Sequence, residues 1–377
     1  MHSNESNLYS AGVPSLPRQS TLPNSTVEMC AVSPSIKNLA ISLLLIAICI
    51  VTFCGNLAVC VTVYANRLLH TTTNFLIVSL ALADLLVSLF SMPFRIDFML
   101  HNEYWCLNLK ACALWIWIDL VACSSSIGSL AAVSIERFVA LKYPLRYPVI
   151  MTRRTGLTMI LVVWSYSAIW ASLGHYNWTS HQPETFTAYR GCGKNDRTYY
   201  TILSSLAFFM PLGIVIGTYS YLTKVAFQQR RWALANTVCP TESTDPQHRA
   251  MRRSRILHEL KAAKMMACVV GVFCVSWVPF FILLHLSLWY SLQSTPAVAE
   301  IFVTILPNLN SSLNPFLYMA FTRELRLHVA KMMKALPVFK LCRYTPRNSA
   351  KTLTQSRAMT TGETAIRQTI ELSARNQ

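Results

Sequence analysis

The sequence predicts an all-α membrane protein: a bundle of seven transmembrane helices followed by a short amphipathic juxtamembrane helix. First, 53% of the 377 residues are hydrophobic and only 13% are charged, whereas about a quarter of a soluble chain is charged. Second, seven apolar stretches are long enough to cross a hydrocarbon layer of about 30 Å. Third, the net charge of +17 is unevenly distributed between the connections. The stretches are 38–66, 73–100, 111–135, 156–176, 199–227, 265–291 and 298–320.

The distribution of charge predicts how the bundle is oriented. Most of the 33 Lys and Arg residues follow the first, third, fifth and seventh stretches. Because basic connections stay in the cytoplasm, we expect a multi-pass plasma-membrane protein with an extracellular N-terminus. These basic residues lie at helix ends and in the tail, without a domain of their own, so a nucleic-acid partner is not expected.

The stretches divide the chain into four predicted segments. Residues 1–36 form a disordered, glycosylated extracellular N-terminus, and residues 37–320 form the seven-helix domain. Residues 321–336 form an amphipathic helix on the membrane surface, and residues 337–377 form a disordered cytoplasmic tail rich in phosphorylatable Ser and Thr. Candidate glycosylation sites on the outer side are Asn4, Asn24 and Asn177.

The first two helices carry polar residues inside apolar sequence. Helix 1 contains Gly55-Asn56, and helix 2 contains Asp84. A carboxylate near the middle of the membrane is costly, so Asp84 should face a polar interior. Arg95 and Asp97 lie near the outer end of helix 2, where we expect them to reach toward the interface.

Helix 3 carries charge at both ends. Asp119 and Arg137 are 18 residues apart, which places them on one helix face, about 27 Å apart. No charge lies between them until Glu136. One helix therefore presents a buried carboxylate near the outer membrane face and an arginine near the inner face.

The twelve cysteines show no metal-ligand spacing. Most lie inside the spans, where a thiol is usually a small apolar filler. Cys112 and Cys192 lie on the outer side, and we expect a disulfide that ties the second outer loop over helix 3. Cys30 and Cys106 are the remaining outward cysteines, so a second bridge stays open.

The later helices carry further motifs. Helix 4 contains Trp164, helix 5 contains Pro211 and Tyr219, and helix 6 contains Trp277 before Pro279. The helix after helix 7 gathers its apolar residues on one face, with basic residues on the other. Cys342 follows and is a candidate palmitoylation site. The apolar face consists of Phe321, Leu325, Val329 and Met332.

Together these motifs resemble the rhodopsin-like family of G-protein-coupled receptors, from helix 1 to the amphipathic helix. They occur in the family's order, about one for each helix. The carriers are Gly55-Asn56, Leu82-Ala83-Asp84, Cys112, Glu136-Arg137-Phe138, Trp164, Pro211 with Tyr219, Phe273-x-x-x-Trp277-x-Pro279 and Asn314-Pro315-x-x-Tyr318.

The resemblance implies a receptor that transmits a signal to heterotrimeric G proteins, with arrestin and receptor kinases as further partners and membrane lipid around it. Arg137, Glu136 and Glu259 would form an ionic lock at the inner face; the alternative is that they are ordinary solvated charges. Leu145 matches the loop position that inserts into the G protein. Other matching switch positions are Ile127, Pro211, Phe273, Tyr219 and Tyr318.

The resemblance also implies one ion and no other cofactor. Four oxygen-bearing side chains match the family's allosteric sodium pocket, and the alternative is a polar network that holds water alone. They are Asp84, Ser126, Asn310 and Asn314.

The resemblance extends to the biogenic amine receptors. Asp119 lies seven residues after Cys112, where those receptors carry their amine-binding aspartate, and a protonated amine would complete this buried carboxylate. Trp277, Phe280 and Phe281 supply an aromatic wall for an aryl group. The other expected ligand-binding residues are Cys123, Ser204 and Asn308.

Several positions depart from that subfamily. Catecholamine receptors carry serines where this chain has Leu203, Ser204 and Ala207, which argues against dopamine and adrenaline. Aminergic receptors usually carry Trp and Tyr at the positions of Ile305 and Asn308.

Other interpretations remain beside the amine receptor. Asp119 pairing with Arg95 would make both residues structural. A non-amine or zwitterionic ligand would use Arg95 to hold a carboxylate, and an orphan receptor would signal without a ligand. Retinal binding is excluded because helix 7 has no lysine. No inverted repeat indicates a transporter, and no nucleophile–base motif indicates an enzyme.

Overall fold

The computed structural model describes residues 30–176, 187–188, 191–194, 196–238, 246–290, 301–321 and 323–335. Within these ranges, the side chains of 187–188, 226, 229–238, 246–267, 321, 323–324 and 332–335 are not described. The chain divides into two compact units, Met1–Phe321 and Thr322–Gln377.

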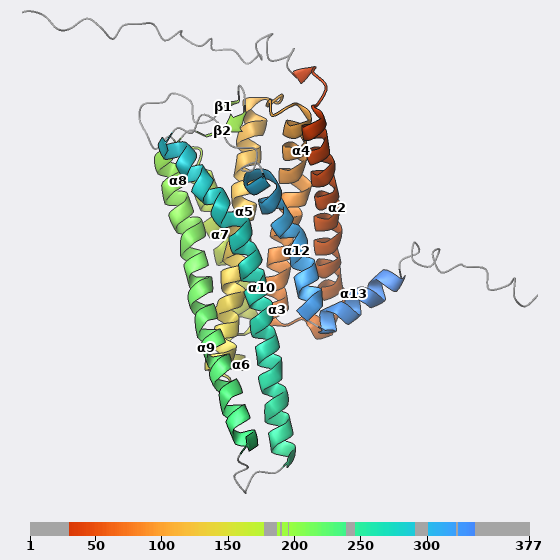
Figure 1. Ribbon diagram of the computed structural model, residues 1–377, viewed down its shortest axis with the longest axis vertical. Coiled ribbons are helices and arrows are strands. Elements are labelled where there is room, and N and C mark those ends of the chain that lie inside the picture. The colour runs from red at the N-terminus through yellow and green to blue at the C-terminus, as the bar shows by residue number, and fades with distance from the viewer. Residues whose placement is uncertain are drawn as a thin grey trace, which may run out of the picture. The chain divides into compact units, whose positions relative to one another are not determined.

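The first unit is an antiparallel helical bundle with one small hairpin (Figure 1). It confirms the seven predicted helices. Three of the seven contain a five- or six-residue π-helical turn. In chain order the elements are α2 (Ile36–Ala65), η1 (Arg67–Leu69), α3 (Thr72–Leu86), the π turn η2 (Val87–Ser91), α4 (Met92–Leu100), α5 (Leu109–Lys142), α6 (Tyr147–Ile150), α7 (Arg153–Leu173), β1 (Thr187–Ala188), β2 (Cys192–Gly193), α8 (Arg197–Leu203), the π turn η3 (Ser204–Phe209), α9 (Met210–Val238), α10 (Pro246–Tyr290), the π turn η4 (Ile301–Ile305) and α12 (Leu306–Phe321).

Capping side chains begin many of these helices. In each case the side-chain oxygen accepts a hydrogen bond from the backbone N–H three residues later, which satisfies a donor that the first turn leaves unpaired. The caps are Ser35 for α2, Thr71 for α3, Asn108 for α5, Thr152 for α7 and Asp196 for α8.

Three helices extend beyond the predicted bounds on the inner side. The apolar stretch of helix 3 ends near 135 but the helix continues to Lys142, helix 5 continues from 227 to Val238, and helix 6 already begins at Pro246, ahead of its apolar stretch. The apolar stretches mark only the part of a helix inside the membrane. Outside it, Arg, Lys, Gln and Ala still favour helix, so the polar continuations stay helical.

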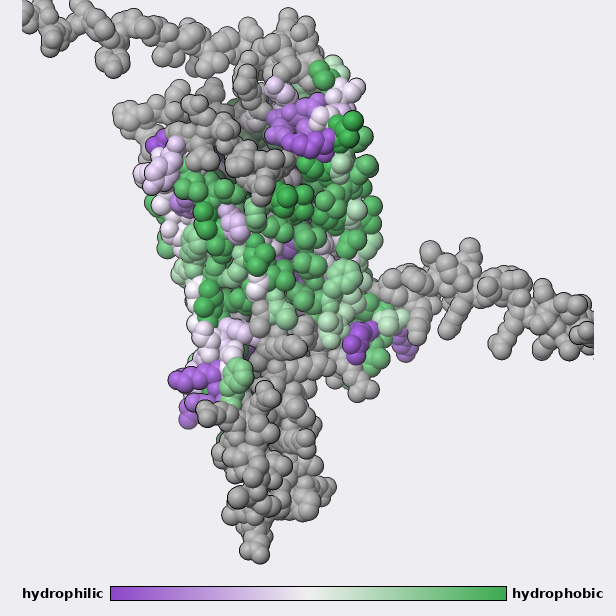
Figure 2. All heavy atoms as spheres, viewed as in Figure 1, coloured by the Kyte–Doolittle hydropathy of each residue, from purple (hydrophilic) through white to green (hydrophobic). Residues whose placement is uncertain are grey.

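Six of the described helical segments are long and apolar enough to cross a membrane. The seventh, η4 with α12, carries five Asn and Ser side chains and falls outside that group. Figure 2 shows the apolar belt on one face of the bundle, with hydrophilic residues gathered toward the two ends. The apolar side chains of this belt face lipid in a membrane, so their exposure in the isolated chain is expected.

Helix α5 is the central helix of the bundle. It packs against α3, α7 and α9, while α12 closes the ring between α2 and α10. Small residues permit the closest approaches. A Cβ atom added at Gly128 would lie 2.8 Å from Val163 Cγ1, and one added at Gly55 would lie 2.9 Å from Pro315 Cγ.

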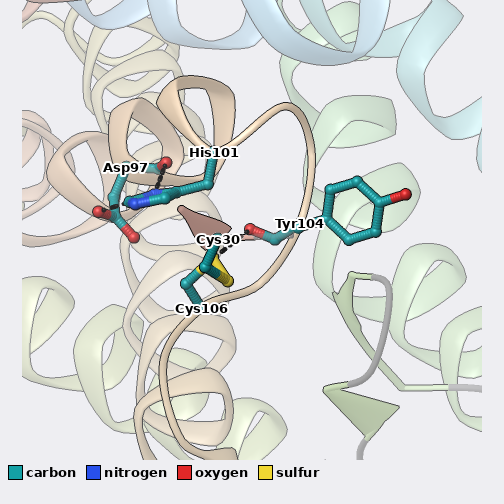
Figure 3. The surroundings of a disulfide bond; sticks show 5 residues. All are labelled: Cys30, Asp97, His101, Tyr104 and Cys106. Carbon is teal, nitrogen blue, oxygen red and sulfur yellow. Dashed lines mark hydrogen bonds and ion pairs between the residues drawn. A yellow bond between two sulfur atoms is a disulfide. The ribbon is translucent and has the colours of Figure 1, made fainter. Parts of the chain in front are cut away.

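Two disulfides hold the outer end of the bundle. The predicted pair Cys112–Cys192 forms, and Cys30–Cys106 forms as well, which settles the pairing left open above. Figure 3 shows the second bridge beside His101, whose ring Nδ1 donates to the Asp97 carbonyl at 2.9 Å. The first outer loop is thus covalently joined to the segment that precedes α2.

A turn with left-handed backbone reinforces this junction. Asn102 and Glu103 have φ values of 56° and 66°, a conformation that Asn tolerates better than most residues. The Asn102 side chain accepts from Ser35 N at 2.8 Å, and Glu103 lies 3.5 Å from Lys37 Nζ. The outer ends of helices 1 and 2 are therefore fixed to one another.

The second outer loop is held by a buried lysine. Lys194 Nζ donates to the carbonyls of Gly174 at 2.5 Å and Tyr176 at 2.6 Å, and lies 3.7 Å from Asp196 Oδ2. Burial lowers the pKa of Lys194, while Asp196 opposes that shift. The ammonium thereby gathers three acceptors at the mouth of the bundle.

In the second unit, the predicted amphipathic helix is α13 (Arg323–Ala335). Leu325 and Val329 lie four residues apart on one face, whereas Arg326 and Lys331 are exposed. The side chains of Phe321 and Met332, which the same face was expected to contain, lie outside the described part.

Candidate functional site

The half-buried Asp119 lies near the outer end of α5, where it faces helix 2. Its Oδ1 accepts a hydrogen bond from the buried Ser91 hydroxyl at 2.5 Å. Ser91 is the last residue of η2, and a π turn shifts the side chains that follow around the helix. This hydrogen bond was not predicted, because the hydrophobic pattern of helix 2 carries no sign of the π turn.

Arg95 lies one helical turn beyond Ser91 and faces the same helix. Its Cζ is 4.8 Å from the centre of the Trp115 ring, so it does not simply reach out to the interface as expected. Arg95 and Asp119 interact through their charges. Among the described residues, however, no ion pair joins them within 4.0 Å.

The ring of Tyr200 and the thiol of Cys123 complete the surroundings of the carboxylate. Both interact electrostatically with Asp119. Cys123 lies four residues after Asp119 on α5 and is within electrostatic range of Asp84 as well. Tyr200 comes from α8, and the sequence patterns did not mark it.

Phe208 is the centre of an aromatic wall between helices 5 and 6. Its ring centre lies 4.0 Å from that of Phe281, 5.6 Å from Phe273 and 6.4 Å from Trp277. Trp277 and Phe280 meet edge to face at 5.5 Å. The predicted aromatic residues therefore form one cluster, held together by a residue that the motifs omit.

Ser204 is turned toward helix 6. Its hydroxyl lies 2.7 Å from the Tyr200 carbonyl and 3.2 Å from His285 Nε2. The other ring nitrogen of His285 lies 2.8 Å from the Phe281 carbonyl. Ser204 is 1% exposed, so it joins two helices here and is not displayed as a donor for a ligand.

Asn308 was expected beside Asp119 as a partial substitute for a tyrosine. Its amide nitrogen instead donates to the Thr304 carbonyl of the same helix at 2.7 Å. Among the described residues, Asp119 is not one of its hydrogen-bond partners. The hydrogen-bond partner that the structure assigns to the carboxylate is Ser91 on the opposite side.

A second buried carboxylate lies at the centre of the bundle. Asp84 is fully buried, and its Oδ2 accepts from Asn314 Nδ2 at 2.9 Å. Its Oδ1 has no hydrogen-bond partner in the described structure. Ser126 and Asn310 are also buried. This unpaired oxygen among polar side chains fits a small hard cation.

The inner end of α5 pairs Glu136 with Arg137. Arg137 Nε lies 3.3 Å from Glu136 Oε2. The other oxygen of the buried Glu136 accepts from Thr73 Oγ1 at 2.9 Å and from the Tyr147 hydroxyl at 2.5 Å. Burial, the larger cause, and the hydrogen bond to Glu136 together raise the pKa of Tyr147 to about 12.

The remaining switch positions are distributed between the core and the inner surface. Ile127, Pro211 and Phe273 are buried, and Tyr219 packs against Val215 and Val270. The hydroxyl of Tyr318 is buried, and within the described ranges it has no hydrogen-bond partner.

Leu145, in contrast, is 93% exposed in the turn before α6, as a residue that inserts into a partner requires. Other predicted sites lie outside the described part of the chain: the Glu259 side chain, and Asn4, Asn24, Asn177 and Cys342.

The fold and these sites define a class of protein. The model of the rhodopsin family of seven-transmembrane receptors matches residues 55–318. The chain belongs to this family.

Among curated proteins, the chain is similar to adrenergic receptors. It is 30% identical to the alpha-1A adrenergic receptor of Oryctolagus cuniculus over 306 residues, covering 74% of this chain and 64% of that protein. It is 30% identical to the same receptor of Oryzias latipes over 331 residues (82% and 68%). It is 31% identical to the alpha-1D adrenergic receptor of Sus scrofa over 344 residues (82% and 59%). The match spans less than two thirds of the length of the rabbit and pig relatives.

Proposed function

We propose that this protein is a plasma-membrane receptor for a small cationic ligand of the biogenic-amine type, an aryl amine, and that it signals to heterotrimeric G proteins. The observation that carries this proposal is the Asp119 carboxylate, whose described hydrogen bonding is limited to the Ser91 hydroxyl. A carboxylate in a largely apolar site is costly without a cation. A protonated amine would supply the missing charge through charge-assisted hydrogen bonds.

The route from this site to the inner face supports the proposal. Phe208 joins Phe281 to Phe273 in the core. A ligand that moves these rings would shift α10 relative to α9, because close-packed interiors transmit displacements. The Glu136–Arg137 pair and its contact with Tyr147 would hold the inner face closed, and the exposed Leu145 would be available to a G protein. Arrestin and receptor kinases would use the same inner surface.

A sodium ion would fit beside Asp84, between the outer site and the inner face of the bundle. Asp84 Oδ1, which has no hydrogen-bond partner in the described structure, would be its charged ligand, and the buried Ser126, Ser311 and Asn310 would supply neutral oxygens. When bound, the ion would neutralise the buried charge. The charge distribution supports an orientation in which the N-terminus lies outside the cell.

The test of the ligand proposal is the substitution Asp119→Asn, which keeps the size of the side chain and removes its charge. Loss of a charged hydrogen bond should weaken responses to amines by about 10- to 100-fold, measured as the EC50 of nucleotide exchange with tyramine, phenethylamine and tryptamine. Surface expression should be unchanged. Asp97→Asn is the matched control, because Asp97 contacts His101 at the outer end of α4. An unchanged amine EC50 in Asp119→Asn would refute the proposal.

A further inference from the structure

The outer site contains a cation as well as an anion. Ser91 and Arg95 are one helical turn apart on helix 2, and Asp119 and Trp115 are one turn apart on α5. The contacts pair them in two levels: Ser91 with Asp119, and Arg95 with Trp115. Four residues of helix correspond to about 6 Å, so the two levels are separated by roughly that distance along the helices.

The two charges do not neutralise one another by direct contact. A stable arginine–carboxylate pair normally forms short, often bidentate, hydrogen bonds. Arg95 instead lies over the Trp115 ring, and among the described residues it forms no ion pair within 4.0 Å of Asp119. Each group therefore retains donors or acceptors for a molecule placed between them.

The level formed by Arg95 and Trp115 presents hydrogen-bond donors that need acceptors. Trp115 is 5% exposed, and its indole N–H has no hydrogen-bond partner in the described structure. Trp115 stacks on Trp105, with ring centres 5.2 Å apart and planes 10° apart, which fixes its position. An arginine and a buried indole N–H, both donors, make a setting that suits an anion such as a carboxylate.

We propose that the ligand is a zwitterion, an aromatic α-amino acid, whose ammonium binds Asp119 and whose carboxylate binds Arg95. This inference rests on the proposed function and names its ligand class. In an α-amino acid both charged groups are attached to one carbon. With a hydrogen bond of about 2.8 Å at each end, they span the separation of the two levels. A simple amine would leave Arg95 without an anion and would meet its positive charge.

The experiment compares ligands that differ only at the carboxyl group. Phenylalanine, phenylalaninamide and phenethylamine, with tyrosine and tyramine as a second series, are applied to the full-length receptor. Nucleotide exchange and surface expression are measured together. In the wild-type receptor the amino acids should be about 10- to 100-fold more potent than the amide or the amine.

Arg95→Gln should remove this preference by weakening the amino acids and leaving the amines unchanged or improved. Arg95→Lys should restore part of it, because the charge returns without the planar fork. Lys110→Gln is the matched control: it removes the same charge from an exposed position of α5 and should leave the preference intact. If Arg95→Lys restores the preference for amino acids, Arg95 acts through its charge on the ligand. If Arg95 were needed only for folding, lysine would not restore that preference.

The outcomes separate this inference from the proposed function. If amines act through Asp119 but the amino acids are no more potent, the zwitterion is refuted and the amine receptor stands. An equal loss of both ligand types in Arg95→Gln makes Arg95 structural and also refutes it. If no probe raises nucleotide exchange by the wild-type receptor at normal surface expression, both proposals fail.

Discussion

Glu136 is the residue on which the polar contacts at the inner end of α5 converge. Its two oxygens face three partners from three parts of the chain: Arg137 on its own helix, Thr73 on α3 and Tyr147 on α6. The motif around Arg137 was visible in the sequence. The contribution of Tyr147 was not, because the sequence does not show how the loop after α5 folds back.

Replacement of Tyr147 by phenylalanine tests this contact. The raised pKa of about 12 keeps the phenol protonated and donating at physiological pH, and its contribution would be lost only as the pH rises through that value. A bond to a carboxylate contributes about 1.5–3 kcal/mol. Tyr147→Phe should therefore raise basal nucleotide exchange by about 10- to 100-fold, equally across the physiological pH range.

Tyr143→Phe is the control for this change, because Tyr143 lies four residues earlier and is 42% exposed. It should leave basal exchange unaltered. If Tyr147→Phe gives no rise, or if both variants rise together, the Tyr147–Glu136 bond does not restrain activation.

The residues that sequence patterns identified and those that they missed differ in a physical way. Asp84, Asp119 and Glu136 stand out because a carboxylate in apolar sequence is rare and costly. Ser91, Phe208 and His285 are ordinary residues in a membrane helix. Their roles come from the neighbours that packing gives them, and a single sequence does not contain that information.

At the scale of the helix, length and hydrophobicity predict which segments cross the membrane but not how each one is rotated. The π turns η2, η3 and η4 interrupt helices 2, 5 and 7 near the outer site. Each shifts the following side chains around the helix axis. This explains why the helices were predictable while the partners of Asp119 and Ser204 were not.

Close approach of helices 1 and 7 depends on Gly55. A Cβ atom there would lie 2.9 Å from Pro315 Cγ, and the proline ring has little freedom to move. Gly55→Val should therefore destabilise the bundle by about 1–3 kcal/mol, the usual cost of overpacking. The measurement is thermal unfolding of the purified receptor.

Gly217→Val is the comparison for this substitution, because a Cβ atom at Gly217 would meet nothing within 4 Å. It should leave the unfolding temperature nearly unchanged. An unfolding temperature of Gly55→Val equal to that of the wild type would mean that helices 1 and 7 separate at little cost.

At the scale of the whole bundle, the outer end is constrained by covalent bonds and the inner end by polar contacts. The Cys30–Cys106 bridge, which the sequence left undecided, joins residues 76 positions apart. Bridges that close long loops contribute typically about 2–4 kcal/mol. The inner face has the Glu136 contacts instead.

Substitution of either cysteine tests the second bridge. Cys30→Ser and Cys106→Ser should lower the unfolding temperature and the surface level equally. The double variant should match each single one, because one bond is lost in every case. Unequal or additive losses would show that the two thiols act separately.

The connectivity of the two bridges also bears on how the protein is made. Cys30, Cys106, Cys112 and Cys192 pair in the order in which they occur along the chain. Each bridge encloses one pair of helices, α2 with α3–α4 and then α5 with α7, and neither crosses the other. During synthesis, the first pair is complete before Cys192 has been translated. Oxidation in the secretory pathway can thus follow translation, helix pair by helix pair, without rearrangement of an earlier bond.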